Sequence, residues 1–156
     1  MQGDDRVIET LNEVLTSELT AINQYFIHAK MSANWGYERR AEHVRQESID
    51  EMKHAERLIE RILYFEGTPN MQRLFPVQVG ESVQEQLQLD LNVEYEAVPR
   101  LNHAIALCVE VGDNGTRDLL EEILVSEEEH VDWLETQLDA IATIGLENYL
   151  AQQLHD

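Results

Sequence analysis

The chain has 156 residues, the length of one globular domain, and its composition is that of a folded protein. Hydrophobic residues make up 43% and charged residues 27%, with only 7 Gly and 3 Pro, which excludes disordered and collagen-like classes. Lys and Arg number 11 against 31 Asp and Glu, a formal net charge of −20. We therefore expect no nucleic acid and no anionic membrane as a partner, and cations as the natural ligands.

The cysteine content and the first residues bear on where the protein works. Cys108 is the single cysteine, so it has no partner for an internal disulfide and cannot build a thiolate cluster. We expect a cytoplasmic location and an ordinary buried thiol. The first thirty residues carry acids where a signal peptide carries basic residues, and no run approaches the ~20 apolar residues of a membrane span.

Apolar residues recur at helical spacing through the first part of the chain. The first stripe predicts a helix over about 5–34, with Asp4 or Asp5 as its cap, and ends at a glycine-containing break. A second stripe predicts a helix over about 37–66. Gly and Pro then punctuate residues 67–81, which indicates a long connector without helical periodicity.

The second part of the chain repeats this helical pattern. The sequence Ser82-Val83-Gln84-Glu85 has the form of a capping box and opens a predicted helix over about 82–111. Pro99 should kink this helix, because proline removes an internal hydrogen bond. After a turn rich in glycine, Thr116 is the expected cap of a helix over about 116–144.

These elements predict an all-α fold in a single domain over residues 1–156. Four long helices joined by one long crossover connection form a four-helix bundle. A short fifth helix over about 146–154 is amphipathic but too short to be stable alone, so it either docks on the bundle or frays. No alternation typical of strands competes with this prediction.

Two Glu-x-x-His motifs carry the chemistry of the chain: Glu51 to His54, and Glu127 to His130. At 3.6 residues per turn, each pair projects from one helix face, so a carboxylate and an imidazole can reach one metal ion. A single motif of this kind is a weak signal in so acidic a chain, because each acid could lie on a solvated helix face. The pair of motifs is more informative.

The two motifs belong to a longer repeat. They lie 76 residues apart, and the same interval separates Glu18 from Glu94. In an antiparallel hairpin, residues at one height are equally far from the turn. The midpoint in sequence between Glu18 and the first motif is near position 35, in the break between the first two helices. The midpoint between Glu94 and the second motif is near position 111, beside the next turn. All six residues are therefore predicted at one height in the bundle.

Four carboxylates and two imidazoles in the middle of a bundle would repel one another and lose hydration unless cations neutralise them. Two divalent metal ions fit this donor set. Mixed carboxylate and imidazole ligation suits iron or manganese and tolerates zinc. Because carboxylates can change between terminal and bridging modes, redox chemistry with O₂ is favoured over storage of a single ion.

The chain resembles the bacterioferritins from its start to Leu154, and the donor set is that of ferritin-like di-iron bundles. The stretches that carry the resemblance are AINQYF at 21–26, ESIDEMKHA at 47–55, DWLET at 132–136 and GLENYL at 145–150. The resemblance implies a ferritin-like four-helix bundle with one long crossover. It also implies a hollow homomeric shell of 24 subunits, built from dimers, which oxidises Fe(II) with O₂ or peroxide and stores a ferric mineral.

The resemblance assigns roles to particular residues. The ferroxidase ligands would be Glu18, Glu51, His54, Glu94, Glu127 and His130. Within this set, Glu51 and Glu127 would be the bridging carboxylates. Tyr25 falls on the tyrosine beside the di-iron centre, although it could equally be a core aromatic whose hydroxyl finds a partner.

Met52 falls on the axial ligand of a haem b that is shared by two subunits. One residue past Glu51, its side chain points about 100° away from the metal-facing side of its helix. Leu19, Ile22, Asn23 and Phe26 could wall an apolar slot for the haem. The alternative for Met52 is a gap-filling methionine in a subunit interface. The family also implies a small ferredoxin as electron donor for iron release.

The sequence departs from the commoner family pattern at Arg45-Gln46, where many bacterioferritins have Tyr-His. In those proteins the histidine and the acid at Asp50 form an iron site on the inner surface. Gln46 is a poor iron ligand, so this auxiliary site is in doubt here. Arg45 could pair with a haem propionate or form a surface ion pair.

Three other functions are compatible with parts of this pattern. One is a non-haem ferritin subunit, and another is a di-iron oxygenase or peroxidase acting on an organic substrate, although little chain is left to build a substrate pocket. A DNA-protecting shell is disfavoured by the negative charge and by six ligands within one chain. The remaining carboxylates would attract Fe(II) by a long-range effect that weakens with salt.

Overall fold

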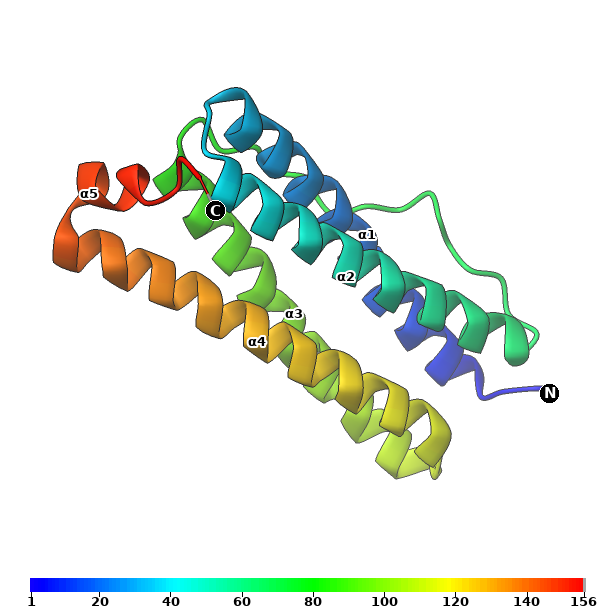
Figure 1. The fold of residues 1–156 in the computed structure, drawn as a ribbon. Helices are drawn as coiled ribbons and strands as arrows, with labels where there is room; N and C mark the ends of the chain where they lie inside the picture. Colours follow the sequence, from blue (N-terminus) through cyan, green and yellow to red (C-terminus); the bar gives the residue numbers. More distant parts are fainter. Residues whose placement is uncertain (156) are drawn as a thin grey trace.

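A computed structural model describes residues 1–155 and confirms the all-α class (Figure 1). Its elements in chain order are α1 (Asp5–Asn34), α2 (Glu38–Tyr64), α3 (Val83–Val111), α4 (Asn114–Ile144) and α5 (Leu146–Ala151). The four long helices lie side by side, with α1 packed mainly on α2 and α3 mainly on α4. The segment between α2 and α3 returns along the whole bundle, which is the predicted long crossover.

The ends of the helices follow local capping chemistry. Asp4 caps α1 by accepting from the backbone N–H of Arg6 at 2.8 Å, and Ser82 caps α3 by accepting from that of Glu85 at 3.2 Å. The expectation for Thr116 was wrong. Asp113 is the N-cap of α4, because its carboxylate accepts from both the backbone N–H and the hydroxyl of Thr116.

Three other boundary predictions can be compared with the structure. The helix expected over 37–66 is slightly shorter, because the chain turns at Phe65 and Glu66 has a left-handed backbone with φ of 62°. Pro99 lies inside one continuous α3, and its kink stays a prediction. The fifth helix is shorter than expected but docks on the bundle, since Tyr149 is buried and donates to Gln137 at 2.8 Å.

Buried hydrophobic residues fill the bundle toward both of its ends, and buried polar residues lie between these two regions. One hydrophobic cluster is built from the start of α1, the end of α2, the end of α3 and the start of α4, and it contains Cys108. This confirms the buried thiol, and burial raises its pKa to about 11. A second cluster joins the other ends of α3 and α4 to α5. The metal-ligand candidates lie between the two clusters along each helix.

The crossover is held by a ladder of polar side chains on α1 that sequence analysis did not identify. Backbone N–H groups of residues 70, 75, 78 and 80 donate, respectively, to side chains of Asn12, Thr20, Gln24 and His28, at 2.8–3.1 Å. These four residues are spaced by multiples of four, so they lie along one face of α1. The ladder satisfies backbone groups that an extended segment would otherwise leave without partners.

None of the helices in the described part of the chain is long and apolar enough to cross a membrane.

Candidate metal centre

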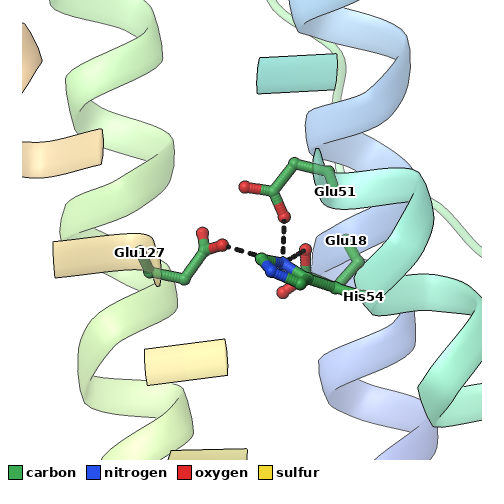
Figure 2. Close-up of side chains that lie close together, drawn as sticks. All are labelled: Glu18, Glu51, His54 and Glu127. Atoms are coloured by element: carbon green, nitrogen blue, oxygen red, sulfur yellow. Dashed lines mark hydrogen bonds and ion pairs between the residues drawn. The ribbon is translucent and has the colours of Figure 1, made fainter. Parts of the chain in front are cut away.

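The first group of metal-ligand candidates is centred on His54 (Figure 2). Donor atoms of Glu18, Glu51, His54 and Glu127 all lie within 4.8 Å of one another. The Nδ1 atom of His54 is 3.2 Å from Glu127 Oε1, 3.3 Å from Glu51 Oε2 and 3.5 Å from Glu18 Oε2. Three carboxylates from α1, α2 and α4 thus point at one imidazole, which is a geometry suited to a shared cation.

The second group lies beside the first and is centred on His130. Donor atoms of Glu51, Glu94, Glu127 and His130 again lie within 4.8 Å of one another. The Nδ1 atom of His130 is 3.0 Å from Glu51 Oε1, 3.6 Å from Glu94 Oε1 and 4.0 Å from Glu127 Oε1. This group draws on α2, α3 and α4, so all four long helices contribute to the two groups together.

Glu51 and Glu127 belong to both groups. Each group therefore offers three carboxylates and one imidazole. Two of the carboxylates belong to both groups, so each of them could contact a cation in either group. The structure brings together all six residues that the repeat predicted at one height. Their action as ligands stays a prediction, and the convergence of their donor atoms supports it.

Burial makes this cluster costly without a cation. Glu51 and Glu94 are fully buried, and the other carboxylates of the cluster are nearly so. Within the cluster, five buried ligand atoms have no hydrogen-bond partner among the residues that the structure describes: Glu18 Oε2, Glu51 Oε1, Glu94 Oε2, Glu127 Oε1 and His130 Nδ1. Buried polar groups normally have partners, and an ion is one of the recognised reasons when they do not. The donor set therefore fits divalent metal ions.

Burial and mutual charge interactions shift the pKa values of the clustered carboxyl groups in opposite directions. Burial, followed by the charges of Glu51 and Glu94, raises the pKa of Glu127 well above its usual value. Burial also raises the pKa of Glu94. Burial acts against the ionised form of Glu51 as well, but the imidazoles of His130 and His54 outweigh it and lower the pKa to about 2. Without metal, protons take over part of the neutralisation.

The pKa of His130 is also set by burial and by neighbouring charges, which act in opposite directions. Burial alone would lower its pKa, but the carboxylates of Glu51 and Glu94 outweigh burial and raise the pKa to about 12. A protonated His130 is therefore the stable form in the cluster. A metal ion that binds His130 must displace this proton, so metal binding releases protons.

Tyr25 lies against the cluster, where the family resemblance places it. It is fully buried, its hydroxyl donates to Glu94 Oε1, and its ring meets that of His130 edge-on with centroids 6.4 Å apart. Burial and the charge of Glu94 raise the pKa of Tyr25 well above 10, so the phenol keeps its proton. The hydrogen bond orients Glu94 within the cluster.

The remaining predicted residues lie outside the buried cluster. Met52 is 48% exposed although Glu51 beside it is fully buried, which confirms that its side chain points out of the bundle. Gln46 donates to Asp50 Oδ1 at 3.1 Å, and Asp50 Oδ2 lies 3.6 Å from His130 Nε2. Arg45 is exposed, and no ion pair ties it to another described residue. The auxiliary site at positions 46 and 50 thus offers an amide and one carboxylate.

Sequence analysis missed three residues beside the centre. His43 Nε2 lies 2.7 Å from Glu47 Oε1, and the His43 ring stacks on Trp133 with centroids 3.8 Å apart. A signal was available for Glu47, because it precedes Glu51 by four residues and so shares its helix face. No local pattern could pair His43 with Trp133, since they belong to α2 and α4.

Comparisons with known proteins agree with this geometry. A family model described as "Ferritin-like domain" matches residues 8–144. A bacterioferritin of Mycolicibacterium paratuberculosis is 54% identical over 97% of this chain and 96% of its own length. Bacterioferritins of Streptomyces coelicolor and Brucella melitensis are 52% and 46% identical, over 97% and 96% of this chain and 90% and 92% of their own lengths. The chain belongs to the bacterioferritin family of ferritin-like proteins.

Proposed function

We propose that the protein stores and detoxifies iron, and that it does so as a ferroxidase that oxidises Fe(II) with O₂ or peroxide. One observation carries this proposal: two adjacent groups of donors share Glu51 and Glu127. Two Fe(II) ions would occupy the two groups as substrate, each held by three carboxylates and one imidazole. The shared carboxylates would hold the ions close enough for both to give an electron to one oxidant.

The protein's own residues would do most of the work by positioning and by charge. Four of the unpartnered atoms are carboxylate oxygens in one buried space, so an incoming cation replaces the repulsion between these carboxylates with attraction. Tyr25 would hold Glu94 in place through its hydrogen bond. The carboxylates also favour Fe(III) over Fe(II), because hard anionic oxygen ligands stabilise the higher charge.

The haem proposal concerns the outer face of α1 and α2. The Ser48 hydroxyl donates to the carbonyl of Ile22 at 2.9 Å, which places these residues level on antiparallel helices. Met52, one turn further along α2, is therefore level with Leu19 on α1. Met52 and Phe26 are exposed, and Leu19 and Ile22 are partly exposed on the stretch of α1 between their levels, so a thioether donor stands at one end of a partly uncovered apolar face. These residues fit one half of a haem site, with the other half from a second subunit.

When bound there, a haem would supply one-electron redox chemistry for iron release. Met52 would hold it through its thioether sulfur, and Leu19, Ile22, Asn23 and Phe26 would line its site. From the family we extend to this chain a homomeric 24-subunit shell built from dimers, a cytoplasmic location and a small ferredoxin as electron donor. The near full-length match to named bacterioferritins supports these proposals.

The test is rapid-mixing oxidation of Fe(II) in air by the purified assembly. Glu18→Ala and His130→Ala remove one donor from each group, so each should abolish the rapid phase and lower the stoichiometry of Co(II) binding. Glu129→Ala is the matched control, because Glu129 is an exposed acid of α4 outside the cluster. An unchanged initial rate in Glu18→Ala and His130→Ala would refute the ferroxidase assignment.

The same experiment separates iron storage from the main alternative. A storage protein retains the oxidised iron inside the assembly after gel filtration. A di-iron oxygenase or peroxidase would consume O₂ or peroxide with an organic substrate and retain no more than its bound ions. Retention of many iron ions per subunit is the expected result.

A further inference from the structure

A stripe of titratable residues runs along one face of α2 toward the metal centre. His43, Glu47 and Glu51 are spaced by four residues, so they lie one above the other on the helix. Their side chains are 41%, 4% and 0% exposed, in that order. The stripe therefore leads from solvent into the buried cluster within two helical turns.

The outer end of the stripe opens into a hollow of about 600 Å³ between α2, α4 and the C-terminal segment. His43 stacks on Trp133 of α4 with an interplanar angle of 15°, and this contact fixes the imidazole at the wall of the hollow. The other lining residues are Arg39, Glu42, Gln137 and Gln153. The charged groups around the imidazole thus all come from α2, while α4 and the C-terminal segment add uncharged amides and an indole.

The middle of the stripe is Glu47, a buried carboxylate whose charge also acts on the buried Arg40 and on His130. Among the described residues, the ion-pair partner of Glu47 is His43, at 2.7 Å, and neither Lys nor Arg contacts it. Burial is the main cause of the raised pKa of Tyr25, and Glu47 is among the carboxylates that add to it. Glu47 is therefore close enough to the centre to feel its charge. About 6 Å of helix rise separates it from Glu51, on the same face of α2.

The proposed reaction produces protons in this buried place. Two Fe(II), one O₂ and four water molecules give two FeO(OH), one H₂O₂ and four protons, with two electrons passing from iron to O₂. Protons that stay in the cluster would occupy the atoms that Fe(II) needs as ligands. Sustained turnover therefore needs a path that carries protons to solvent.

We propose that Glu47 and His43 form this path, a proton exit from the metal centre to the hollow beside Trp133. The proposal rests on the ferroxidase function proposed above. Glu47 takes up a proton released in the centre and passes it to Nε2 of His43. His43 then gives the proton on its Nδ1 atom to water in the hollow, which leaves the ring protonated on Nε2. A 180° turn of the ring, which keeps it stacked on Trp133, resets it for the next proton. His is suited to both steps at neutral pH.

The experiment follows iron oxidation and proton release together, with a pH-indicator dye in the rapid-mixing assay. In the wild type, proton release should keep pace with oxidation. In His43→Ala, proton release should lag and repeated turnover should slow about 100-fold or more, in line with the contribution of general acid–base groups. Glu47→Gln should behave in the same way. His103→Ala is the control, because His103 is an exposed histidine of α3.

Chemical rescue distinguishes proton transfer from a structural role. Removal of the His43 ring enlarges the hollow, so added imidazole should restore turnover in His43→Ala, and substituted imidazoles should do so in the order of their pKa values. His43→Gln keeps a donor for Glu47 and fills the space, so it should be slow and resist rescue. Co(II) binding should be unchanged in every variant. This measurement tests whether the metal site is intact and does not depend on iron oxidation.

Two results would overturn the proposal. One is wild-type turnover with simultaneous proton release in His43→Ala. The other is a slow His43→Ala protein that imidazole does not restore, which would indicate a packing role or a path for Fe(II). If the wild type itself oxidised no Fe(II), the ferroxidase function would fall and the exit with it, so the two failures are distinguishable.

Discussion

Replacement of Glu127 by glutamine should stabilise the metal-free protein and weaken the metal-bound one. Glu127 is buried in both donor groups, with other carboxylate oxygens within 4.8 Å. At that separation and an effective dielectric constant of ~20, two unit charges interact by about 3 kcal/mol. The nearby imidazoles offset part of this repulsion. We therefore expect Glu127→Gln to raise the free energy of unfolding of the metal-free protein by about 1–3 kcal/mol at neutral pH.

The pH dependence of this gain has a definite sign. Because the pKa of Glu127 is raised in the folded state, the folded protein holds a proton that the unfolded chain releases above about pH 4.5. The stability due to Glu127 is complete below that value and is lost as the pH rises toward the folded-state pKa. Glu127→Gln has no proton to lose there, so its advantage over the wild type should grow from pH 5 to pH 8.

The measurement is urea unfolding of chelator-treated protein by circular dichroism, at pH 5 and pH 8 and at one fixed protein concentration, because assembly contributes to stability. Glu129→Gln, exposed on the same helix, is the control for removal of a charge. Saturating Co(II) should reverse the order, with the wild type more stable. If Glu127→Gln were less stable than the wild type without metal at both pH values, the account of a repulsive cluster would be refuted.

Two further predictions test the outer face and the crossover. Met52→Leu should remove the Soret band of bound haem and leave Co(II) binding unchanged, because Met52 points away from the cluster; a haem spectrum that survives the change would refute the axial role. His28→Leu should lower the free energy of unfolding by at least about 2 kcal/mol, because the buried Gly80 N–H and Asp90 carboxylate each lose a partner. Lys30→Leu, exposed on the same helix, is the control for His28, and equal effects of the two substitutions in urea unfolding would contradict this account.

The link between His28 and the crossover also fixes a tautomer. Nε2 of His28 accepts from the backbone N–H of Gly80 at 2.9 Å, so the ring proton lies on Nδ1 and is donated to Asp90 at 2.8 Å. Gln24 donates to the same Asp90 oxygen at 2.9 Å. These contacts join α1, α3 and the crossover in one buried network. It explains why polar residues occupy the face of α1 opposite the predicted apolar stripe.

Much of the metal centre could be predicted from the sequence because its determinants are local or periodic. The Glu-x-x-His spacing puts both donors of a motif on one helix face, whatever the bundle does around it. The midpoint of each hairpin fixes the height of its donors, and the 3.5 Å contact between Glu18 and His54 agrees with that register. Apolar periodicity set the number of long helices and nearly all of their ends for the same reason.

The tertiary structure decided what depends on distant partners. The extended backbone of residues 70–80 has no repeating hydrogen bonds of its own, so contacts with α1, more than fifty residues away, and with Gln86 and Arg100 of α3 hold it in place. The stack of His43 on Trp133 likewise arises between α2 and α4. Helices could be predicted because their periodicity depends on residues a few positions apart. The pairings above depend on how the helices pack, and the spacing of residues along the chain does not determine that packing.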